Sequence, residues 1–360
     1  MKARNEYRAK QSRKWRREQY WRSVWYDGHP AAWWMGFAEK LFGGLVGLRR
    51  FFYRKGLFPV RRLPVPVIVV GNITAGGTGK TPFVIWLVHE LKERGFRPGV
   101  VSRGYGGVRK VEPMQVTPNS NPNASGDEAL LIARRTGVPV MVGKRRATAA
   151  KKLLAGHPIN VIVADDGLQH YALGRDVEIA LIDGRLGLGN GRLLPAGPLR
   201  EPQSRLRSVD MVLCKGACDD DHCFEPILGD AWSLAQPSKK KSLSEFIGQP
   251  VHALAGIAQP GHFFRLLAAQ GVAAFKHPLP DHHVLVPQDF ELAGDYPILI
   301  TEKDAVKCQD LAGNWKQRVW VVPMDLHVPE ETRSFLWDCL NDKAGLRVSH
   351  VATKRRKEVI

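Results

Sequence analysis

From Pro64 onward the chain alternates short apolar runs with amphipathic stretches. Apolar runs bounded by turn residues are typical of buried strands, whereas apolar residues that recur every three or four positions are typical of helices. The pattern predicts strands at 65–72, 98–107 (with a following loop), 139–143, 160–167, 177–184 and 209–216, and helices at 81–95, 126–137 and 146–157. Continuous apolar strands separated by amphipathic helices indicate a parallel sheet covered on both faces, and hence an α/β fold.

A second, smaller α/β unit is predicted from Val251, and 360 residues are enough for about two domains. Apolar segments at 251–258, 273–283, 296–307 and 318–326 surround a helix at 261–271. The polar stretch AQPSKKKSLSEFIGQP between the two units is the expected linker. The predicted organisation is a basic arm and helix (1–60), a first domain (61–235), a linker (236–250), a second α/β domain (251–345) and a basic tail (346–360).

An amphipathic helix is predicted in PAAWWMGFAEKLFGGLVGLRRFFYRKGLF, before the first domain. The residues of its apolar face recur at helical spacing: Trp34, Phe37, Ala38, Leu41, Phe42, Leu45 and Leu48. Glu39 and Lys40 interrupt the run, so the segment is a poor candidate to span a bilayer, which needs about 20 predominantly apolar residues. A Trp- and Phe-rich face flanked by cations is typical of a helix in a membrane interface; packing on the domain core is the alternative.

The formal net charge of +18 indicates an anionic partner: nucleic acid, a phospholipid surface or a phosphorylated substrate. Much of the excess lies in the N-terminal stretch MKARNEYRAKQSRKWRREQYWRSVW, with a smaller cluster, KRRK, near the C-terminus. Two solvated tails are the alternative explanation for these clusters. The five cysteines are too few and too unevenly placed for a disulfide framework, and no signal peptide is recognised, so the cytoplasm is the expected compartment.

The turn between the first predicted strand and helix reads TAGGTGKT and ends like a Walker A loop, or P-loop. Backbone N–H groups of such a turn converge on a phosphate, Lys80 adds a charge at the β- and γ-phosphates, and the Thr81 hydroxyl can bind magnesium. Thr74 stands where the usual pattern has its first glycine. The residues expected to bind a nucleoside triphosphate are Thr74, Ala75, Gly76, Gly77, Thr78, Gly79, Lys80 and Thr81.

The predicted strand NVIVADDG ends in Asp165 and Asp166 and resembles a Walker B strand, which delivers a carboxylate to magnesium. A surface turn would explain a single aspartate, but two at the end of a buried strand favour a functional role. A nucleoside triphosphate and Mg²⁺ are therefore the expected cofactors, with Thr81, Asp165 and Asp166 as metal ligands. Which aspartate contacts the metal stays open. The first unit is accordingly predicted as a P-loop NTPase-like domain.

These motifs, in their order along the chain, resemble those of the tetraacyldisaccharide 4'-kinase family: GNITAGGTGKTP, SRGYGG, GDEALLIA, VADDGLQH, GRLLPAGPLREP, LPDHH and TEKDAVK. Enzymes of this family phosphorylate the lipid A precursor at the inner membrane of Gram-negative bacteria. The resemblance runs from about Trp25 to Val322, and DDGxQH and LPAGPLRE make it specific because they are not general P-loop signatures. The chain departs from the family at Ala258 and His262, where Gly and Arg are usual.

The resemblance implies transfer of the γ-phosphate of ATP to the 4'-hydroxyl of tetraacyldisaccharide 1-phosphate, which forms lipid IVA. It implies two α/β/α domains with the active site in the cleft between them. The family's catalytic carboxylate falls on Asp127, its partner histidine on His282 and its phosphate-contacting arginine on Arg200, beside Lys80 of the P-loop. Because the acceptor is an anionic lipid, the resemblance also implies a peripheral location on the cytoplasmic face of the inner membrane and no nucleic-acid partner.

Two other functions stay open from the residues themselves. The charge and the Trp- and Arg-rich arm would suit a P-loop ATPase that acts on nucleic acid, although the aromatic residues form a helical stripe and are not interleaved for base stacking. A non-catalytic membrane-bound nucleotide sensor is the other alternative, and it would not need an acceptor-side base such as Asp127. By position alone, Asp127 is also a candidate helix N-cap.

Overall fold

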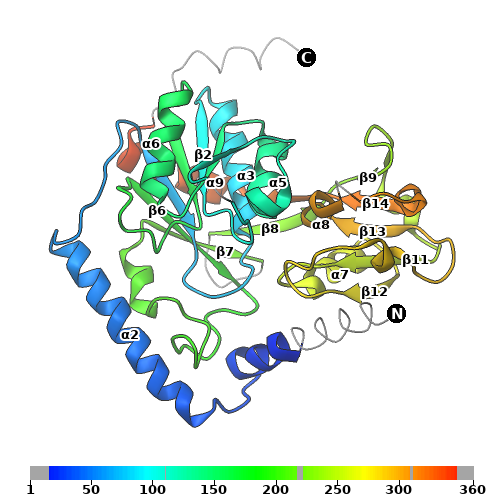
Figure 1. Cartoon of the computed structure of the whole chain (residues 1–360), viewed down its shortest axis with the longest axis horizontal. Coiled ribbons are helices and arrows are strands. Elements are labelled where there is room, and N and C mark those ends of the chain that lie inside the picture. Colours follow the sequence, from blue (N-terminus) through cyan, green and yellow to red (C-terminus); the bar gives the residue numbers. More distant parts are fainter. Residues whose placement is uncertain (1–15, 110, 217–221, 309–310, 347–360) are drawn as a thin grey trace.

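The computed structural model describes residues 16–109, 111–216, 222–308 and 311–346, which fold into two α/β units side by side (Figure 1). Most of the predicted basic arm and nearly all of the predicted basic tail lie outside the described residues. Each unit is built on one sheet, and most neighbouring strands within the two sheets are parallel. The predicted α/β class is therefore confirmed.

The first unit is a nine-stranded sheet with the order β15-β8-β7-β6-β1-β5-β2-β4-β3. The pairs from β8 to β4 are all parallel, and the edge strands β15 and β3 are antiparallel to their neighbours. Its strands are β1 (Val67–Gly71), β2 (Pro98–Ser102), β3 (Met114–Val116), β4 (Val140–Val142), β5 (Val161–Asp165), β6 (Val177–Asp183), β7 (Met211–Lys215), β8 (Cys223–Leu228) and β15 (Met324–His327).

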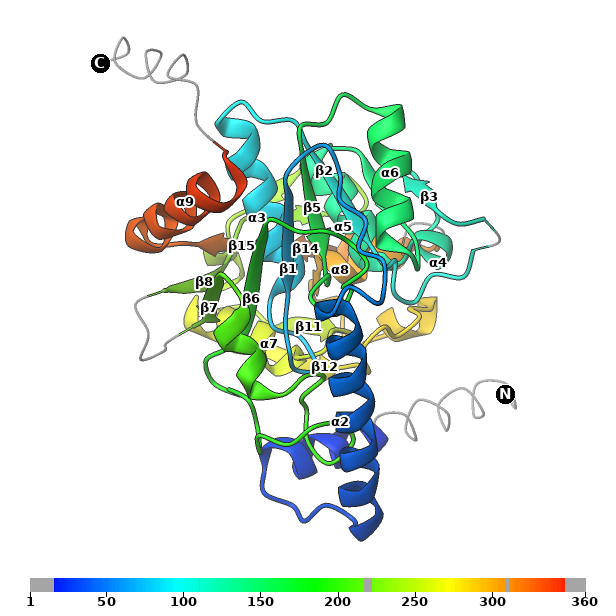
Figure 2. The ribbon, with the colours of Figure 1, turned by 90° about the vertical axis from the view of Figure 1, so that its left-hand side faces the viewer.

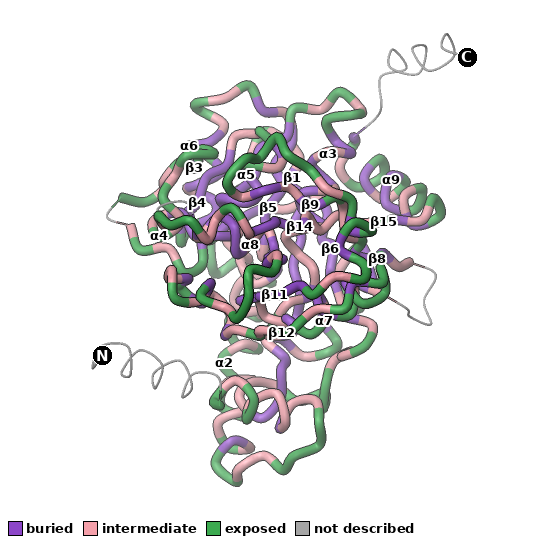
Figure 3. Tube along the Cα trace, turned by 90° about the vertical axis from the view of Figure 1, so that its right-hand side faces the viewer, coloured by how far each residue is buried: buried purple, intermediate pink, exposed green. Residues whose placement is uncertain are grey.

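Helices cover both faces of this sheet, as the continuous apolar strands require. One face packs against α3 (Lys80–Glu93), α5 (Asp127–Thr136) and α9 (Glu330–Ala344), and the other against α6 (Arg146–Gly156). Short elements lie in the connections: α4 (Pro122–Ser125) and the 3₁₀ helix η1 (Gln203–Ser208). The buried residues are concentrated in the strands between these layers (Figure 3).

The second unit is a six-stranded sheet with the order β10-β9-β14-β13-β11-β12. Its strands are β9 (Ala231–Ser233), β10 (Lys240–Lys241), β11 (Val251–Ala255), β12 (Ala274–Pro278), β13 (Ile298–Thr301) and β14 (Val319–Val322). Its helices are α7 (Pro260–Ala269), α8 (Glu302–Ala305) and the 3₁₀ helices η2 (Leu243–Phe246), η3 (Pro287–Phe290), η4 (Val306–Cys308) and η5 (Asn314–Arg318). Apolar cores lie on both faces of the sheet.

The segment 236–250, which the sequence predicts as a linker, is part of the second unit instead. It contains β10 and η2, and it buries Leu243 and Phe246 in the core of that unit. Its polar composition conceals these two apolar anchors. At the other end of the predicted second domain, β15 pairs with β8 and α9 packs on the first sheet, so the chain crosses between the units more than once.

The predicted amphipathic helix is α2 (Trp33–Arg54), which extends along the outside of the first unit (Figure 2). It is held by Glu39, whose carboxylate accepts from the backbone N–H of Leu193 at 2.9 Å and from Arg192 Nη2 at 2.6 Å. The large apolar side chains that it leaves exposed are Trp33, Trp34, Phe37, Leu41, Leu45, Leu48 and Phe51. Among the described residues, no helix is both long and apolar enough to cross a bilayer.

We expect Leu336→Ala in α9 to destabilise the first unit. The side chain is fully buried against the sheet, and truncation of a buried leucine costs about 2–5 kcal/mol through lost apolar contact and the cavity left behind. Urea unfolding followed by circular dichroism measures the change in the free energy of unfolding. Leu45→Ala, at a position 59% exposed on α2, is the matched control and should change it by less than about 0.5 kcal/mol. Equal effects of the two substitutions would contradict the packing of α9.

Candidate active site

The P-loop connects β1 to α3, as the sequence predicts, and its backbone conformation explains two of its three glycines. Gly76 and Gly79 have φ values of 119° and 82°, a region that residues with a side chain rarely adopt. Thr74 is not among the residues with positive φ, so this departure from the usual glycine causes no backbone strain. Its side chain is buried, and Asn72 Nδ2 donates to its hydroxyl oxygen at 3.3 Å.

A second segment, residues 193–201, supports the P-loop from one side. The backbone N–H of Ala75 donates to the carbonyl of Pro198 at 2.7 Å, and the backbone N–H of Arg200 donates to the carbonyl of Ile73 at 2.7 Å. Thr74 and Leu199 form an isolated β-bridge. The LPAGPLRE motif therefore fixes the course of the P-loop backbone and places Arg200 beside it.

Lys80, Asp166 and Arg200 form a charge cluster at the P-loop. Lys80 Nζ lies 3.6 Å from Asp166 Oδ1 and donates to Asn72 Oδ1 at 3.1 Å, and Arg200 Nη1 donates to Asp166 Oδ2 at 3.1 Å. Burial alone would raise the pKa of Asp166, but the charges of Lys80 and Arg200 outweigh it and lower the pKa to about 2. Two cations and one carboxylate leave this cluster with net positive charge, which suits a bound polyphosphate.

Asp165 lies at the end of β5 and is 1% exposed. Ser102 Oγ donates to its Oδ2 at 2.8 Å, and its Oδ1 has no hydrogen-bond partner among the described residues. Burial and the negative charges of Glu128 and Asp166 raise the pKa of Asp165. A cation close to Oδ1 would relieve this unfavourable charge. Within the described ranges, no group of three or more His, Cys, Asp or Glu side chains is placed to hold a metal.

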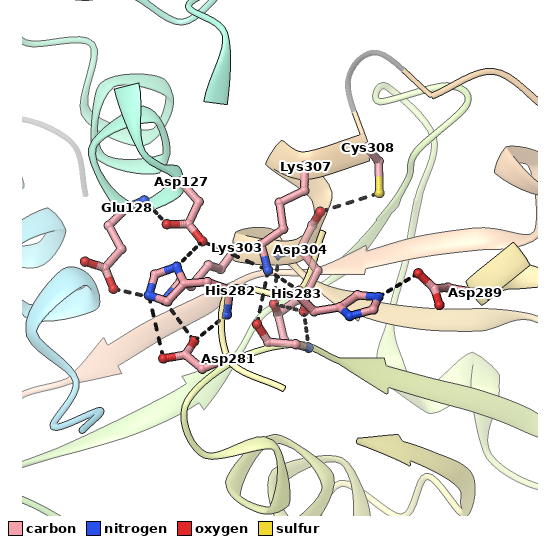
Figure 4. Close-up of polar contacts among 12 residues, drawn as sticks. Asp127, Glu128, Asp281, His282, His283, Asp289, Lys303, Asp304, Lys307 and Cys308 are labelled. Carbon is pink, nitrogen blue, oxygen red and sulfur yellow. Dashed lines mark hydrogen bonds and ion pairs between the residues drawn. The ribbon is translucent and has the colours of Figure 1, made fainter. Parts of the chain in front are cut away.

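Asp127 and His282 meet across the boundary between the two units (Figure 4). Asp127 is the first residue of α5, and His282 lies in the loop after β12. His282 Nδ1 lies 3.1 Å from Asp127 Oδ2, within hydrogen-bond distance. The helix N-cap is Gly126, not Asp127, and the other carboxylate oxygen, Asp127 Oδ1, accepts from the backbone N–H of Glu128 at 3.0 Å. The fold thus brings together the two residues of the pair that the resemblance implies, although they lie far apart in the chain.

Two lysines that the sequence analysis left without a role surround this pair (Figure 4). Lys303 Nζ donates to Glu128 Oε1 at 2.9 Å, and Lys307 Nζ lies 4.0 Å from Asp127 Oδ2. Although burial opposes the shift, Lys303 and the hydrogen bond from His282 hold the pKa of Asp127 well below its usual range. The lysines stand four residues apart in TEKDAVK. This spacing is about one helical turn, so the sequence could have indicated that both side chains lie on the same side of a helix.

The structure brings the predicted site residues together in two groups. The first group contains the P-loop, Asp165, Asp166 and Arg200, and the second contains Asp127 and His282. Asp166 and His282 are the only described non-glycine residues with positive φ, at 48° and 54°. Such backbone conformations are costly for residues with a side chain and are concentrated at functional sites. Thr81 begins α3 with Lys80, and its side chain is half-buried.

The two units also make a contact at the P-loop that the sequence analysis missed. Gln259 Nε2, from the second unit, donates to the carbonyl of Gly77 at 2.7 Å and to Asp183 Oδ2 at 3.1 Å. Asp183 is held in turn by Lys215 at 2.5 Å. The added methyl group of a residue at position 77 would lie 3.1 Å from the Cβ of Ala258, so the second unit closely approaches the tip of the P-loop.

Comparison with known proteins identifies relatives of this chain. The model of the family "Tetraacyldisaccharide-1-P 4'-kinase" (LpxK) matches residues 31–341. The chain is 50% identical over 292 residues to the tetraacyldisaccharide 4'-kinase of Methylobacillus flagellatus. The aligned region covers 80% of this chain and 86% of that protein. It is 46% identical over 306 residues to the enzyme of that name from Nitrosococcus oceani. This aligned region covers 85% of this chain and 89% of the relative.

A solved structure supports the same relationship. It is described as the "apo" form of LpxK from Aquifex aeolicus in complex with ATP, and it matches with a TM-score of 0.68 and 27% sequence identity, over 84% of this chain and 96% of that one. Both units take part in these matches, which point to a lipid kinase and not to a nucleic-acid ATPase or a nucleotide sensor. The chain therefore belongs to the tetraacyldisaccharide 4'-kinase family, with that kinase function in lipid A biosynthesis.

Proposed function

We propose that this chain transfers the γ-phosphate of ATP with Asp127 as the base that takes the proton from the 4'-hydroxyl of the lipid acceptor. The observation that carries the proposal is the contact of Asp127 with His282 across the two units. A sugar hydroxyl is a weak nucleophile until its proton is removed, and general-base catalysis of this kind contributes about 10²–10⁴-fold. The base has to lie opposite the phosphoryl donor, which in this proposal is ATP on the P-loop.

The low pKa of Asp127 sets the role of His282. A carboxylate with a depressed pKa is a weak proton acceptor by itself. As a carboxylate it accepts hydrogen bonds only, so the contact at 3.1 Å has Nδ1–H of His282 as its donor. The imidazole then orients the carboxylate, and the carboxylate takes the proton from the acceptor hydroxyl. Lys303 and Lys307 keep the local charge favourable for an anionic acceptor.

The P-loop and its neighbours are the proposed donor site. Backbone N–H groups of residues 74–81 would hold the phosphates, and Lys80 and Arg200 would offset the charge that develops on the transferred group. The buried hydroxyl of Thr78, which has no hydrogen-bond partner among the described residues, is a further group available to a phosphate oxygen. The relative from Aquifex aeolicus is described in complex with ATP, which supports ATP as the donor.

The residues at the end of β5 fit a magnesium ion. The donor set is a hydroxyl and carboxylates, and Mg²⁺ is usually bound by one or two carboxylates together with substrate phosphates. We propose Asp165 and Thr81 as the groups on the metal, because Asp165 Oδ1 is buried without a partner while both oxygens of Asp166 already face cations. A magnesium ion held by these residues would supply positive charge that offsets the charge of the phosphates.

We propose that α2 attaches the chain to the cytoplasmic face of the inner membrane. Its exposed apolar side chains recur at helical spacing from Trp33 to Phe51, and its last two turns carry Arg49, Arg50 and Arg54. Aromatic and aliphatic side chains at headgroup depth, with cations that meet anionic lipid, are the usual means of interfacial binding. A lipid acceptor would then reach the cleft without leaving the membrane surface.

Asp127→Ala should lower kcat by roughly 10²–10⁴-fold and leave ATP affinity nearly unchanged, as expected for the loss of a general base. His282→Ala should also lower kcat, and the double variant should be much less than additive because the pair acts as one unit. Steady-state kinetics with a melting curve for each variant measures this. Full recovery of Asp127→Ala at high magnesium would show instead that Asp127 is a metal ligand.

Asp165→Asn and Asp166→Asn should have different effects. Loss of the Asp165 carboxylate should raise the magnesium concentration needed for half-maximal turnover, because a ligand has been removed. Loss of the Asp166 charge should act mainly on KM for ATP, since Lys80 and Arg200 lose their shared partner. A magnesium titration of both variants at saturating acceptor distinguishes them. The reverse pattern would assign the metal to Asp166.

Replacement of Phe37, Leu41 and Leu45 by serine should weaken membrane attachment at least tenfold. Each of these side chains is more than half exposed, and burial of a large apolar side chain contributes about 1.5–3 kcal/mol. Flotation with vesicles that contain anionic phospholipid, at low and high salt, measures the change. The matched control is the pair Ile227→Ser and Ile247→Ser, which are exposed away from α2. Flotation equal to that of the unaltered chain would place the membrane contact elsewhere.

A further inference from the structure

A cavity of about 580 Å³ lies over the P-loop, between the two units. Its volume falls within the roughly 300–1,000 Å³ that is usual for small-molecule sites. Residues 74–78 of the P-loop form one side of it. The other sides are residues 183–187 after β6, residues 257–264 at the start of α7, and a helical segment at 16–26 that precedes α2.

The order of the strands indicates which part of ATP reaches this cavity. In the first sheet, β1 lies between β5 and β6. Asp165 is the last residue of β5 and Asp166 follows it, whereas the cavity residue Asp183 is the last residue of β6 and Leu186 lies just after it. If the γ-phosphate faces the β5 side and Asp127, the nucleoside extends from the P-loop toward the β6 side. This step rests on the proposed function, which places ATP on the P-loop in that direction.

The lining of the cavity suits a nucleobase. Trp21, Trp25 and Tyr26 of the helical segment share it with Ile257 and Phe264 of the second unit. Nucleobases stack on aromatic side chains, and binding sites for small ligands are lined mainly by apolar and aromatic groups. We infer that the helical segment 16–26 forms one wall of the adenosine site, with Trp21, Trp25 and Tyr26 in contact with the nucleoside of ATP.

Hydrogen bonds hold this wall in place. Trp25 Nε1 donates to the carbonyl of Pro195 at 3.0 Å, and its own carbonyl accepts from the backbone N–H of Asn190 at 2.9 Å. Val24 is 2% exposed and packs in a small apolar cluster with Met35 and Ala196. The Tyr26 hydroxyl lies 3.5 Å from the carbonyl of Ala75, so the wall reaches the P-loop itself.

The wall precedes the residues that the family model matches, which begin at residue 31. The adenosine contacts inferred for Trp21, Trp25 and Tyr26 are therefore a property of this chain that the family match does not describe. The segment is joined directly to α2, so the element that completes the nucleoside site is continuous with the helix proposed to lie on the membrane.

Calorimetric titration with ATP and with inorganic tripolyphosphate tests the inference, because only ATP carries a nucleoside. Trp21→Ala and Tyr26→Ala should each raise the Kd for ATP about tenfold and leave the Kd for tripolyphosphate unchanged within about twofold. Tyr26→Phe, which keeps the ring, should bind ATP as the unaltered chain does. Tyr20→Ala is the matched control, because Tyr20 belongs to the same segment, is 39% exposed and does not line the cavity.

Other outcomes would overturn the inference in identifiable ways. Equal weakening of ATP and tripolyphosphate would show that the substitutions disturb the P-loop. A higher KM for the lipid acceptor with an unchanged Kd for ATP would assign the cavity to an acyl chain. Absence of ATP binding by the unaltered chain would overturn the proposed function as well. If ATP binding survives both alanine substitutions, only the assignment of segment 16–26 to the adenosine site is overturned.

Photolabelling of the unaltered chain with 8-azido-ATP gives a second test that does not depend on how the variants fold. The azido group is attached to the base, so the label should be recovered in the peptide that contains Trp21, Trp25 and Tyr26, and excess ATP should suppress it. Label recovered only in peptides from other parts of the chain would contradict the inference.

Discussion

The contact between Asp127 and His282 joins the two units at the proposed active site, and the proposed transfer from nucleotide to lipid depends on it. The two residues come from different units and lie 3.1 Å apart. Ion pairs of Lys303 with Glu128 and of Arg135 with Glu302 cross the same boundary. The chain also crosses it covalently, since β15 and α9 return to the first sheet after β14. The units are therefore connected at several places besides the contact of Asp127 with His282.

The segment 189–201 links the elements that serve the donor. At one end, Asn190 and Pro195 form hydrogen bonds with the helical segment 16–26. The backbone N–H of Leu193 donates to Glu39 of α2. At the other end it pairs with the P-loop and places Arg200 on Asp166. One short backbone segment thus separates the proposed membrane helix from the P-loop. A change in the position of α2 would therefore displace the P-loop backbone.

The features predicted best from the sequence depend on local pattern. The strand before the P-loop, the helix after it, the helices at 126–137 and 146–157, and the loop itself follow from apolar periodicity and glycine placement. The strand β9 was missed because it pairs with the distant strand β14, and β10 was missed because it is only two residues long and pairs with β9. Leu243 and Phe246 were hidden in a polar stretch. The boundary at α9 was missed because nothing in its pattern shows which sheet it covers.

The candidate site divides in the same way. Lys80, Thr81 and the Asp165–Asp166 pair belong to motifs with a physical signature, and the sequence predicted them without help. The pairing of Asp127 with His282 came from the family resemblance alone, because 155 residues separate them and neither has a local signature. Lys303 and Lys307 stood in a recognised motif without a role, since only the fold brings them to Asp127.

Phosphoryl transfer to lipid is the central claim, and it is tested most directly with radiolabelled ATP, purified protein and tetraacyldisaccharide 1-phosphate in detergent micelles. The products are separated by thin-layer chromatography. The account predicts label on the lipid with the unaltered chain and none with a folded Lys80→Ala variant, because the ammonium group at the β- and γ-phosphates is lost. Label released only as inorganic phosphate, at a rate that does not depend on the lipid, would contradict it.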